Sequence, residues 1–183
     1  MINASQNSSV NETWVSTEDK KIKQLSKSFD CNVIDRPSKM ATDNSKSEEA
    51  LIHFAENYIF DIIVFIQPTS PLLTSDDIDG GLNLISKNDS VFSGYREHWL
   101  PRWREKENLK PFRWNVNKRP FRQEKDYKFV ENGAFYITTR DRLLSSQLRY
   151  SGKIGIYEMP FSRSIQLDNK DDIKVIKAML KNR

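Results

Sequence analysis

Residues 61–78 read "DIIVFIQPTSPLLTSDDI" and combine the most strand-like run of the chain with an abrupt end. Consecutive apolar residues at 62–66 predict a strand that is buried on both of its faces. The run stops in a cluster of prolines and polar residues at 67–71, before a helix begins. Ligands of open α/β sheets bind outside the carboxyl ends of the strands, so this loop lies where a ligand would bind. Taken alone, the loop is more typical of an ordinary strand-to-helix connection, with Thr74 or Ser75 as the helix cap.

The rest of the chain alternates strand patterns with helix patterns around this run. Strand patterns occur at 13–17, 31–35, 61–67, 90–95, 133–139 and 153–160. Amphipathic helix patterns separate them, except between the fourth and fifth strands, where a segment bearing prolines and tryptophans intervenes. The alternation predicts an α/β fold: a single Rossmann-like domain, residues 1–183, with a mostly parallel sheet and helices on both faces.

The composition is that of a soluble globular domain. Of the 183 residues, 37% are hydrophobic and 30% are charged, which excludes a disordered chain. No apolar stretch approaches the length of a membrane span, and the first residues lack the pattern of a signal peptide. Cys31 is the single cysteine, so no internal disulfide can form. These features predict a cytoplasmic protein that does not associate with a membrane.

The net charge of +4 is concentrated in residues 94–125, which we call the basic segment. This segment holds ten Lys or Arg against four Glu, and it also carries Trp99, Trp103 and Trp114. Arg and Trp together are typical of protein interfaces, and the segment is a candidate dimerisation element. A solvated loop is the alternative. Composition also allows a nucleic-acid binder, and the interspersed glutamates count against that function.

The ordered motifs of the chain resemble those of the acylneuraminate cytidylyltransferases, the CMP-sialic acid synthetase family. The motifs are "TWVSTEDKKI" (13–22), "RPSKMATD" (36–43), "FIQPTSPLLTSDDID" (65–79), "RPFRQEKDYKFVENGAFYI" (119–137) and "MPFSRSIQLDNKDD" (159–172). Each motif alone is modestly specific, but their common order covers nearly the whole chain. The resemblance implies a nucleotidyltransferase that transfers CMP from CTP to a nonulosonic, sialic-acid-like sugar with Mg²⁺, and that forms a homodimer.

The resemblance also assigns candidate site residues. It implies that Asp168 binds the metal and that Arg122 is a catalytic residue beside the sugar carboxylate. It places the remaining substrate contacts at Gln67, Thr69, Ser70, Gln123, Asn132 and Gly133. These residue types suit the task, because carboxylate oxygens bind Mg²⁺ and a guanidinium fork matches a carboxylate. Without the resemblance, Asp168 is read as a helix cap, Asn132-Gly133 as a turn and Arg122 as a solvated charge.

Two departures from the family pattern stand out. The family opens with a buried strand and a glycine-rich loop of the form A-R-x-G-S-K-G, and this sequence contains no such loop. The resemblance therefore predicts an N-terminally truncated sheet in which the neighbours of that strand lack hydrogen-bond partners. The alternative function is a catalytically inactive remnant that cannot hold the phosphates of CTP. Secondly, Gln166 stands where the family has an aspartate, so we expect weaker Mg²⁺ binding at Gln166 and Asp168.

Overall fold

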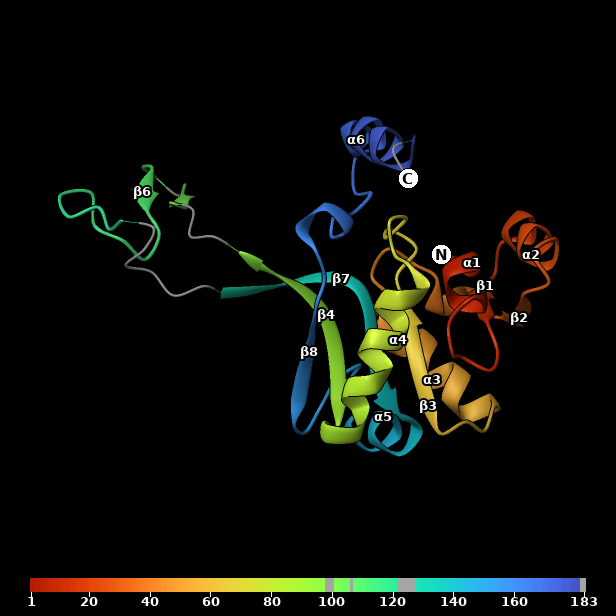
Figure 1. Cartoon of the computed structure of the whole chain (residues 1–183). Coiled ribbons are helices and arrows are strands. Elements are labelled where there is room, and N and C mark those ends of the chain that lie inside the picture. Colours follow the sequence, from red (N-terminus) through yellow and green to blue (C-terminus); the bar gives the residue numbers. More distant parts are fainter. Residues whose placement is uncertain (98–100, 106, 122–127, 182–183) are drawn as a thin grey trace.

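The computed structural model describes residues 1–97, 101–105, 107–121 and 128–181. Its elements follow the predicted order, with one further short helix at the start (Figure 1). The helices are α1 (Ile2–Gln6), α2 (Lys20–Lys27), α3 (Ser47–Asn57), α4 (Ser75–Leu84), α5 (Arg140–Ser146) and α6 (Lys170–Lys181), with short 3-10 turns η1 (Ser38–Met40), η2 (Ile85–Lys87) and η4 (Phe161–Arg163). The strands are β1 (Trp14–Thr17), β2 (Asn32–Asp35), β3 (Ile62–Ile66), β4 (Ser90–Glu97), β5 (Trp103–Arg104), β6 (Lys110–Pro111), β7 (Lys128–Thr139) and β8 (Ile154–Glu158).

The larger sheet has the strand order β3-β7-β4-β8. Strand β7 runs antiparallel to both β3 and β4, while β4 and β8 are parallel. Strands β3, β4 and β8 therefore point the same way, as the sequence predicts, and β7 is the exception. The sequence could not reveal this reversal, because an apolar strand has the same pattern in either direction.

The smaller sheet consists of the parallel strands β1 and β2. It lies on the β3 side of the larger sheet, and the described strands β1 and β3 are not paired (Figure 1). Both are edge strands in the described part of the chain. An aromatic cluster links β1 to α3 instead: the Trp14 ring lies 5.5 Å from Phe54 and 4.4 Å from Tyr58.

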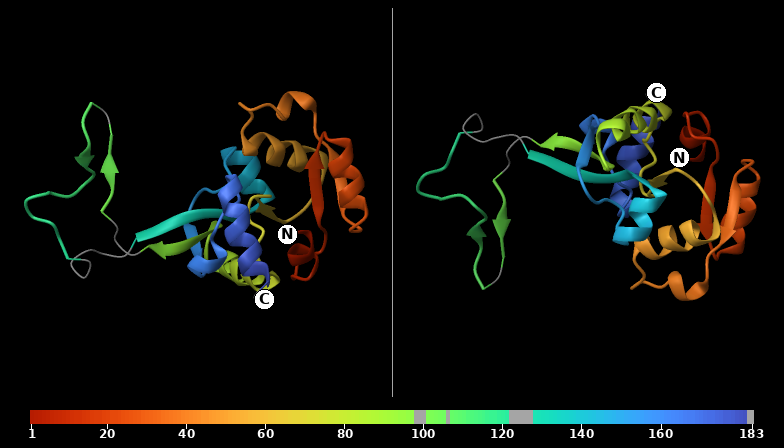
Figure 2. Two further views of the ribbon diagram at one scale, coloured as in Figure 1. Left: turned by 90° about the horizontal axis from the view of Figure 1, so that it is seen from above. Right: turned by 90° about the horizontal axis from the view of Figure 1, so that it is seen from below.

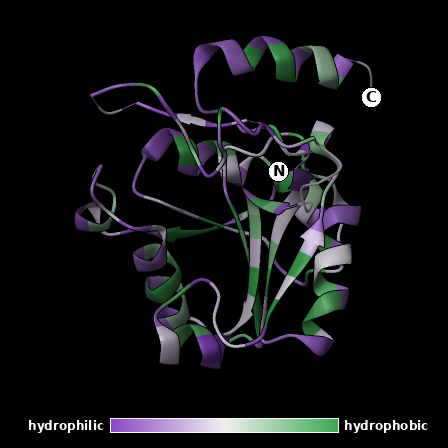
Figure 3. Ribbon diagram, turned by 90° about the vertical axis from the view of Figure 1, so that its left-hand side faces the viewer, coloured by the Kyte–Doolittle hydropathy of each residue, from purple (hydrophilic) through white to green (hydrophobic). Residues whose placement is uncertain are grey.

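Strand β3 contributes side chains to two separate hydrophobic cores. Val64 and Ile66 pack against the cluster under α4, which includes the fully buried Phe135 and Ile137 of β7. Ile63 and Phe65 pack against the cluster under α3 and α5. Apolar side chains therefore pack on both faces of this strand, because successive side chains of a strand point to opposite faces. The predicted burial is not complete, because the four residues 63–66 are half-buried and Ile62 is 40% exposed. Figure 3 shows hydrophobic residues along the strands, and hydrophobic and hydrophilic residues alternating along the helices beside them.

The described residues of the basic segment beyond β4 lie away from this body (Figure 2). Its described part forms the short antiparallel pair β5–β6, with the Trp103 and Trp114 rings 5.0 Å apart and edge to face. Several apolar side chains are exposed there, among them Leu109 at 62% and Phe121 at 72%. The tryptophans of the described part therefore pack on each other within the segment and not against the core.

Gly81 of α4 sets how closely this helix approaches the sheet. A Cβ atom at this position would lie 2.5 Å from Cε2 of Phe135 and 2.9 Å from Cδ1 of Ile137. We expect Gly81→Ala to lower the free energy of unfolding by about 1–2 kcal/mol, because overpacking outweighs the gain in helix propensity. Urea denaturation measures this change. The control is Asn83→Ala on the exposed side of α4, and an equal effect of both variants would contradict the packing argument.

Candidate functional site

The loop that follows β3 turns back sharply and is held by the backbone. The amide of Gln67 donates to the carbonyl of Ala134 at 3.1 Å, which extends the β3–β7 pairing by one residue. The amide of Ser70 then donates to the carbonyl of Gln67, and the amide of Leu73 donates to that of Ser70. Ser70 is only 1% exposed as a result. The prolines Pro68 and Pro71 suit this tight path, because they restrict the backbone.

Gln166 ties this loop to the segment that follows β8. Its Oε1 accepts a hydrogen bond from Oγ1 of Thr69 at 2.6 Å, and its Nε2 donates to Oγ of Ser70 at 2.7 Å. The amide of Leu167 also donates to the carbonyl of Thr69 at 2.8 Å. The structure therefore brings the predicted site residue Gln166 together with Thr69 and Ser70, which lie 97 and 96 positions earlier in the sequence.

Gly133 of β7 lies against the same group. Its φ is +69°, a conformation that side chains disfavour. A Cβ atom here would also lie 2.5 Å from Oε1 of Gln67 and 3.8 Å from Oε1 of Gln166. Glycine therefore suits this position, because its φ is positive and a Cβ atom would crowd the side chain of Gln67.

Asn132 is 5% exposed, and its side chain is committed to the protein. Its Oδ1 accepts from Oγ of Ser93 at 2.7 Å and from the amide of Ala134 at 3.1 Å. Its Nδ2 donates to Oγ of Ser164 at 2.9 Å and also contacts the sulfur of Met159. A substrate contact through this side chain would displace one of these partners, so the observed role of Asn132 is to join β4, β7 and the segment after β8.

Asp168 is exposed, directly after the Gln166 bridge. Its interpretation as the cap of the last helix is wrong, because Oδ1 of Asn169 accepts the amides of Asp171 at 2.9 Å and Asp172 at 3.2 Å. In the part of the chain that the structure describes, the Asp168 carboxylate accepts no hydrogen bond; only its backbone amide is bonded, to Oδ2 of Asp172. The carboxylate is therefore available to a ligand.

The donor set can be compared with the needs of Mg²⁺. Among the described residues, no three His, Cys, Asp or Glu side chains gather closely enough to hold a metal ion. Mg²⁺ usually takes one or two protein carboxylates and completes its shell with water and substrate phosphates. The single available carboxylate of Asp168 fits that kind of site, with the amide oxygen of Gln166 as a second oxygen.

Sequence reasoning missed the ion pair between Asp77 and Arg163. Asp77 is completely buried near the start of α4, and both of its oxygens accept from the Arg163 guanidinium, at 2.6 Å and 3.0 Å. Burial raises the pKa of the Asp77 carboxyl, but the bonds from Arg163 and Thr74 outweigh burial and hold this pKa below its usual range. The pattern Thr74-x-x-Asp77 indicates a helix cap. Nothing local points to Arg163, 86 positions away.

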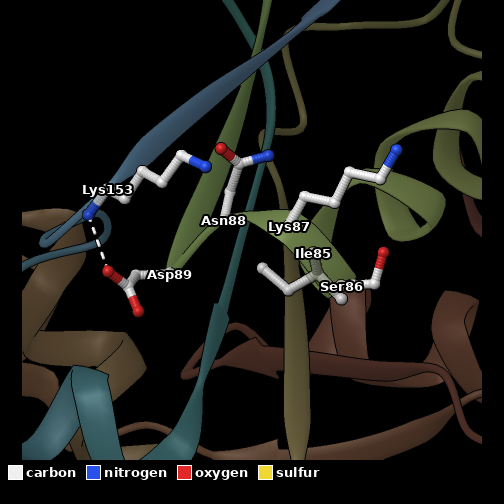
Figure 4. Close-up of a pocket in the computed structure, with 6 residues that line it drawn as sticks. All are labelled: Ile85, Ser86, Lys87, Asn88, Asp89 and Lys153. Atoms are coloured by element: carbon white, nitrogen blue, oxygen red, sulfur yellow. Dashed lines mark hydrogen bonds between the residues drawn. The ribbon is translucent and has the colours of Figure 1, made fainter.

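Two predicted site residues, Arg122 and Gln123, lie outside the described residues. A pocket of about 330 Å³ lies at the opposite end of the sheet, where β4 and β8 begin (Figure 4). It is lined by Ile85, Ser86, Lys87, Asn88, Asp89 and Lys153. The Asp89 carboxylate is occupied there, since it accepts from the amide of Lys153 at 2.7 Å. None of the predicted site residues lines this pocket.

The sheet, the helices on its two faces and the polar group at the strand ends define an α/β protein of nucleotidyltransferase-like fold. A crystal structure of 4-diphosphocytidyl-2C-methyl-D-erythritol synthase from Anaerococcus prevotii superposes on it with a TM-score of 0.63. The match covers 94% of this chain and 82% of that one at 11% sequence identity, so it shows the fold alone.

The sequence comparisons identify the family. The family model described as "Cytidylyltransferase" matches residues 1–178, and the chain belongs to this family. It is 34% identical over 176 residues to N-acylneuraminate cytidylyltransferase B of Danio rerio, covering 92% of this chain and 41% of that protein. The N-acylneuraminate cytidylyltransferase of Oncorhynchus mykiss is 34% identical over 163 residues, with 85% and 37% covered. The chain thus spans about two fifths of the length of these curated relatives.

The hydrogen bonds of Asn132 lead to a stability prediction. Asn132→Ala removes the buried bonds to Ser93 and Ser164 and the acceptor of the Ala134 amide, while the two serines keep their bonds to the carbonyls of Phe135 and Pro160. We expect the free energy of unfolding to fall by about 2–4 kcal/mol. Thermal and urea denaturation measure this loss. In the control Asn57→Ala, the side chain is exposed at the end of α3 and bonds one carbonyl, so the loss should stay within about 1 kcal/mol. A normal stability of Asn132→Ala would show that the amide does not hold these elements together.

Proposed function

We propose that the protein transfers CMP from CTP to a nonulosonic, sialic-acid-like sugar and releases pyrophosphate. One observation carries the proposal: Gln67, Thr69, Gly133 and Gln166 come from three distant stretches and meet at the carboxyl end of β3, with Asp168 directly beyond. This is the end of an α/β sheet at which ligands bind. The named activity of the N-acylneuraminate cytidylyltransferases from fish supports the same function.

In the proposed reaction, the anomeric hydroxyl of the sugar attacks the α-phosphorus of CTP, the bond to pyrophosphate breaks, and the hydroxyl proton is released to solvent. The catalytic contribution is positioning and charge neutralisation, since phosphoryl transfer needs little covalent chemistry from the protein. Gln67 offers an amide to the sugar hydroxyls at the Gly133 side of the site. We assign Arg122 to the sugar carboxylate, with Gln123 beside it, because a guanidinium binds a carboxylate through two hydrogen bonds.

We further propose that Mg²⁺ is held by Asp168, with Gln166 contributing an amide oxygen. When bound, Mg²⁺ would neutralise negative charge on the phosphates. Asp168 suits this role because its carboxylate is exposed and is not used by the helix cap. Gln166 would have to share an oxygen that now accepts from Thr69, which supports weaker metal binding than a pair of aspartates gives.

We also propose a homodimer that forms through the basic segment. The exposed apolar surface of this segment supports the proposal, with Trp103 at 47% and Phe121 at 72% exposed. Interfaces are enriched in aromatic residues and Arg, and the segment provides both.

None of the helices in the described ranges is long and apolar enough to cross a bilayer. We expect the protein to work in the cytoplasm.

The second candidate function is binding of the sugar without transfer. The observation that favours it is that the sheet is divided, because the described strands β1 and β3 are not paired with each other. The phosphates of CTP need backbone amides and positive side chains, which a glycine-rich loop commonly supplies. This sequence contains no loop of the form A-R-x-G-S-K-G, so CTP would lack these contacts. Under this alternative, the sugar raises the melting temperature of the protein while no pyrophosphate forms.

The proposed function predicts a metal-dependent release of pyrophosphate. We expect the purified protein to form a CMP-sugar from CTP, Mg²⁺ and one member of a panel of nonulosonic acids, identified by mass. Asp168→Asn should lower kcat by about a hundredfold or more, because it removes the available carboxylate. The matched control is Asp171→Asn, whose carboxylate bonds the exposed Lys174 and which should keep normal activity.

The outcomes of this assay separate the candidates. Sugar-dependent stabilisation without pyrophosphate would favour binding over transfer. Neither product nor stabilisation with any sugar of the panel would contradict both candidates. Equal activity of Asp168→Asn and Asp171→Asn would remove Asp168 from the site.

The amide at position 166 predicts a specific dependence on metal concentration. Gln166→Asp adds a second carboxylate near Asp168, so we expect the half-saturating Mg²⁺ concentration to fall by about threefold or more. Measuring the rate against Mg²⁺ at fixed CTP tests this expectation. Gln166→Asn is the control, because it shortens the side chain equally without adding charge. An unchanged Mg²⁺ dependence in Gln166→Asp would show that this position does not contact the metal.

A further inference from the structure

The carboxylate of Asp77 receives more hydrogen bonds than a helix cap requires. Thr74 donates to Oδ2 through its amide at 3.1 Å and its hydroxyl at 2.8 Å, and these bonds complete the cap of α4. Arg163 adds one bond to each oxygen, and the hydroxyl of Tyr157 approaches Oδ1 at 3.4 Å. Asp77 has no exposed surface, whereas Arg163 keeps 30% of its side chain exposed. The cap of α4 is complete without Arg163, so capping alone does not explain why this residue of η4 also bonds Asp77.

Arg163 lies at the start of the segment that carries the candidate site. Ser164 follows and is held by Asn132, and the Gln166 amide and the Leu167 backbone are bonded to the loop after β3. All of these contacts are hydrogen bonds between neutral groups. Among the described contacts that hold 163–167 to this part of the fold, the Asp77 pair is the ionic one. Charge-assisted bonds to a buried carboxylate are the stronger kind and fix both distance and direction.

The two ends of this ion pair differ in rigidity. Asp77 is anchored in α4, beside Ile78, which is fully buried in the hydrophobic core. Arg163 belongs to a short 3-10 turn, and beyond Ser164 the stretch 165–169, which contains no buried residue, leads to α6. The ion pair therefore fixes the segment after Arg163, which has few buried residues of its own, relative to the rigid helix α4.

We propose that the Asp77–Arg163 ion pair positions Gln166 against Thr69 and Ser70, and with it the following Asp168, for CMP transfer, so that Asp77 and Arg163 are positioning residues. The kinetic part of this inference rests on the proposed function. Neither residue needs to touch the substrates. A shift of the 163–168 segment by a fraction of an ångström is enough to weaken a site that works by positioning.

The experiment compares Arg163→Lys, Arg163→Gln and Asp77→Asn with the wild-type chain. Amide hydrogen exchange, read by mass spectrometry on peptides that cover 160–169 and 134–138, reports the order of the segment and of the core separately. We expect the 160–169 peptide of Arg163→Gln to exchange about tenfold faster, with the 134–138 peptide unchanged. Arg163→Lys retains one charged bond and should lie between the wild type and Arg163→Gln.

The control is a second ion pair that has the same geometry and lies away from the site. Arg149 donates to both oxygens of Glu48, between α5 and α3, and both side chains are largely buried. Arg149→Lys should leave exchange in 160–169 at the wild-type rate. In the transfer assay, Arg163→Gln should lower kcat about tenfold to a hundredfold and raise the half-saturating Mg²⁺ concentration, whereas Arg149→Lys changes neither.

The results separate this inference from the proposed function. Wild-type exchange of 160–169 in both Arg163 variants would overturn the positioning role. Equal acceleration in both peptides would also overturn it, because it would show that the pair only stabilises the fold. If Asp77→Asn does not fold, the Arg163 variants still test whether the ion pair positions the segment. If the wild-type chain transfers no CMP, the proposed function fails, while the exchange rates still show whether the pair holds the segment.

Discussion

Strand β7 is hydrogen-bonded on both sides, and this double pairing determines where the candidate site lies. Phe135 faces Ile66 of β3, and Tyr136 faces Phe92 of β4, which places the centre of β7 between the two strands. The same strand carries Phe135 and Ile137 into the core under α4. Beyond these buried residues, the register between β4 and β7 shifts around Asn132 and Gly133. The irregularity falls at the end of β3, so the polar group of the site begins where the regular ladder ends.

Polar side chains are buried at the end of the sheet that carries the candidate site, and their hydrogen bonds offset the free-energy cost of burying them. Ser70, Ser93, Asn132 and Ser164 are all buried, and each of their side chains has a partner in the protein. A buried polar group without a partner costs about 1–3 kcal/mol, so a connected set must be satisfied as a whole. Such a set has one arrangement, which holds the loop after β3 and the segment after β8 in a fixed relation before any ligand binds. Apolar packing would stabilise the same elements but would fix their relative position less uniquely.

The sequence predicts the elements well because their signals are local. The apolar run 62–66 and the alternation of strands and helices depend on the nearest residues along the chain, and the structure has these elements in the predicted order. The convergence of Gln67 with Gly133 and Gln166 followed from the family resemblance and the rule for strand ends, not from spacing. The reversal of β7 and the ion pair of Asp77 with Arg163 could not be predicted, because each depends on how distant segments meet. The commitment of the Asn132 amide to Ser93 and Ser164 is of the same kind.

Gln166 shows how a neutral side chain can serve a site that is expected to bind a cation. Two carboxylates at positions 166 and 168 would lie on the same side of an extended segment and would repel each other whenever no cation lies between them. An amide has no charge, and it offers both a donor and an acceptor. Gln166 uses both, accepting from Thr69 and donating to Ser70. The segment can therefore stay on the loop without a cation. We expect the loss of one charge to weaken metal binding, while the site is assembled before a cation arrives.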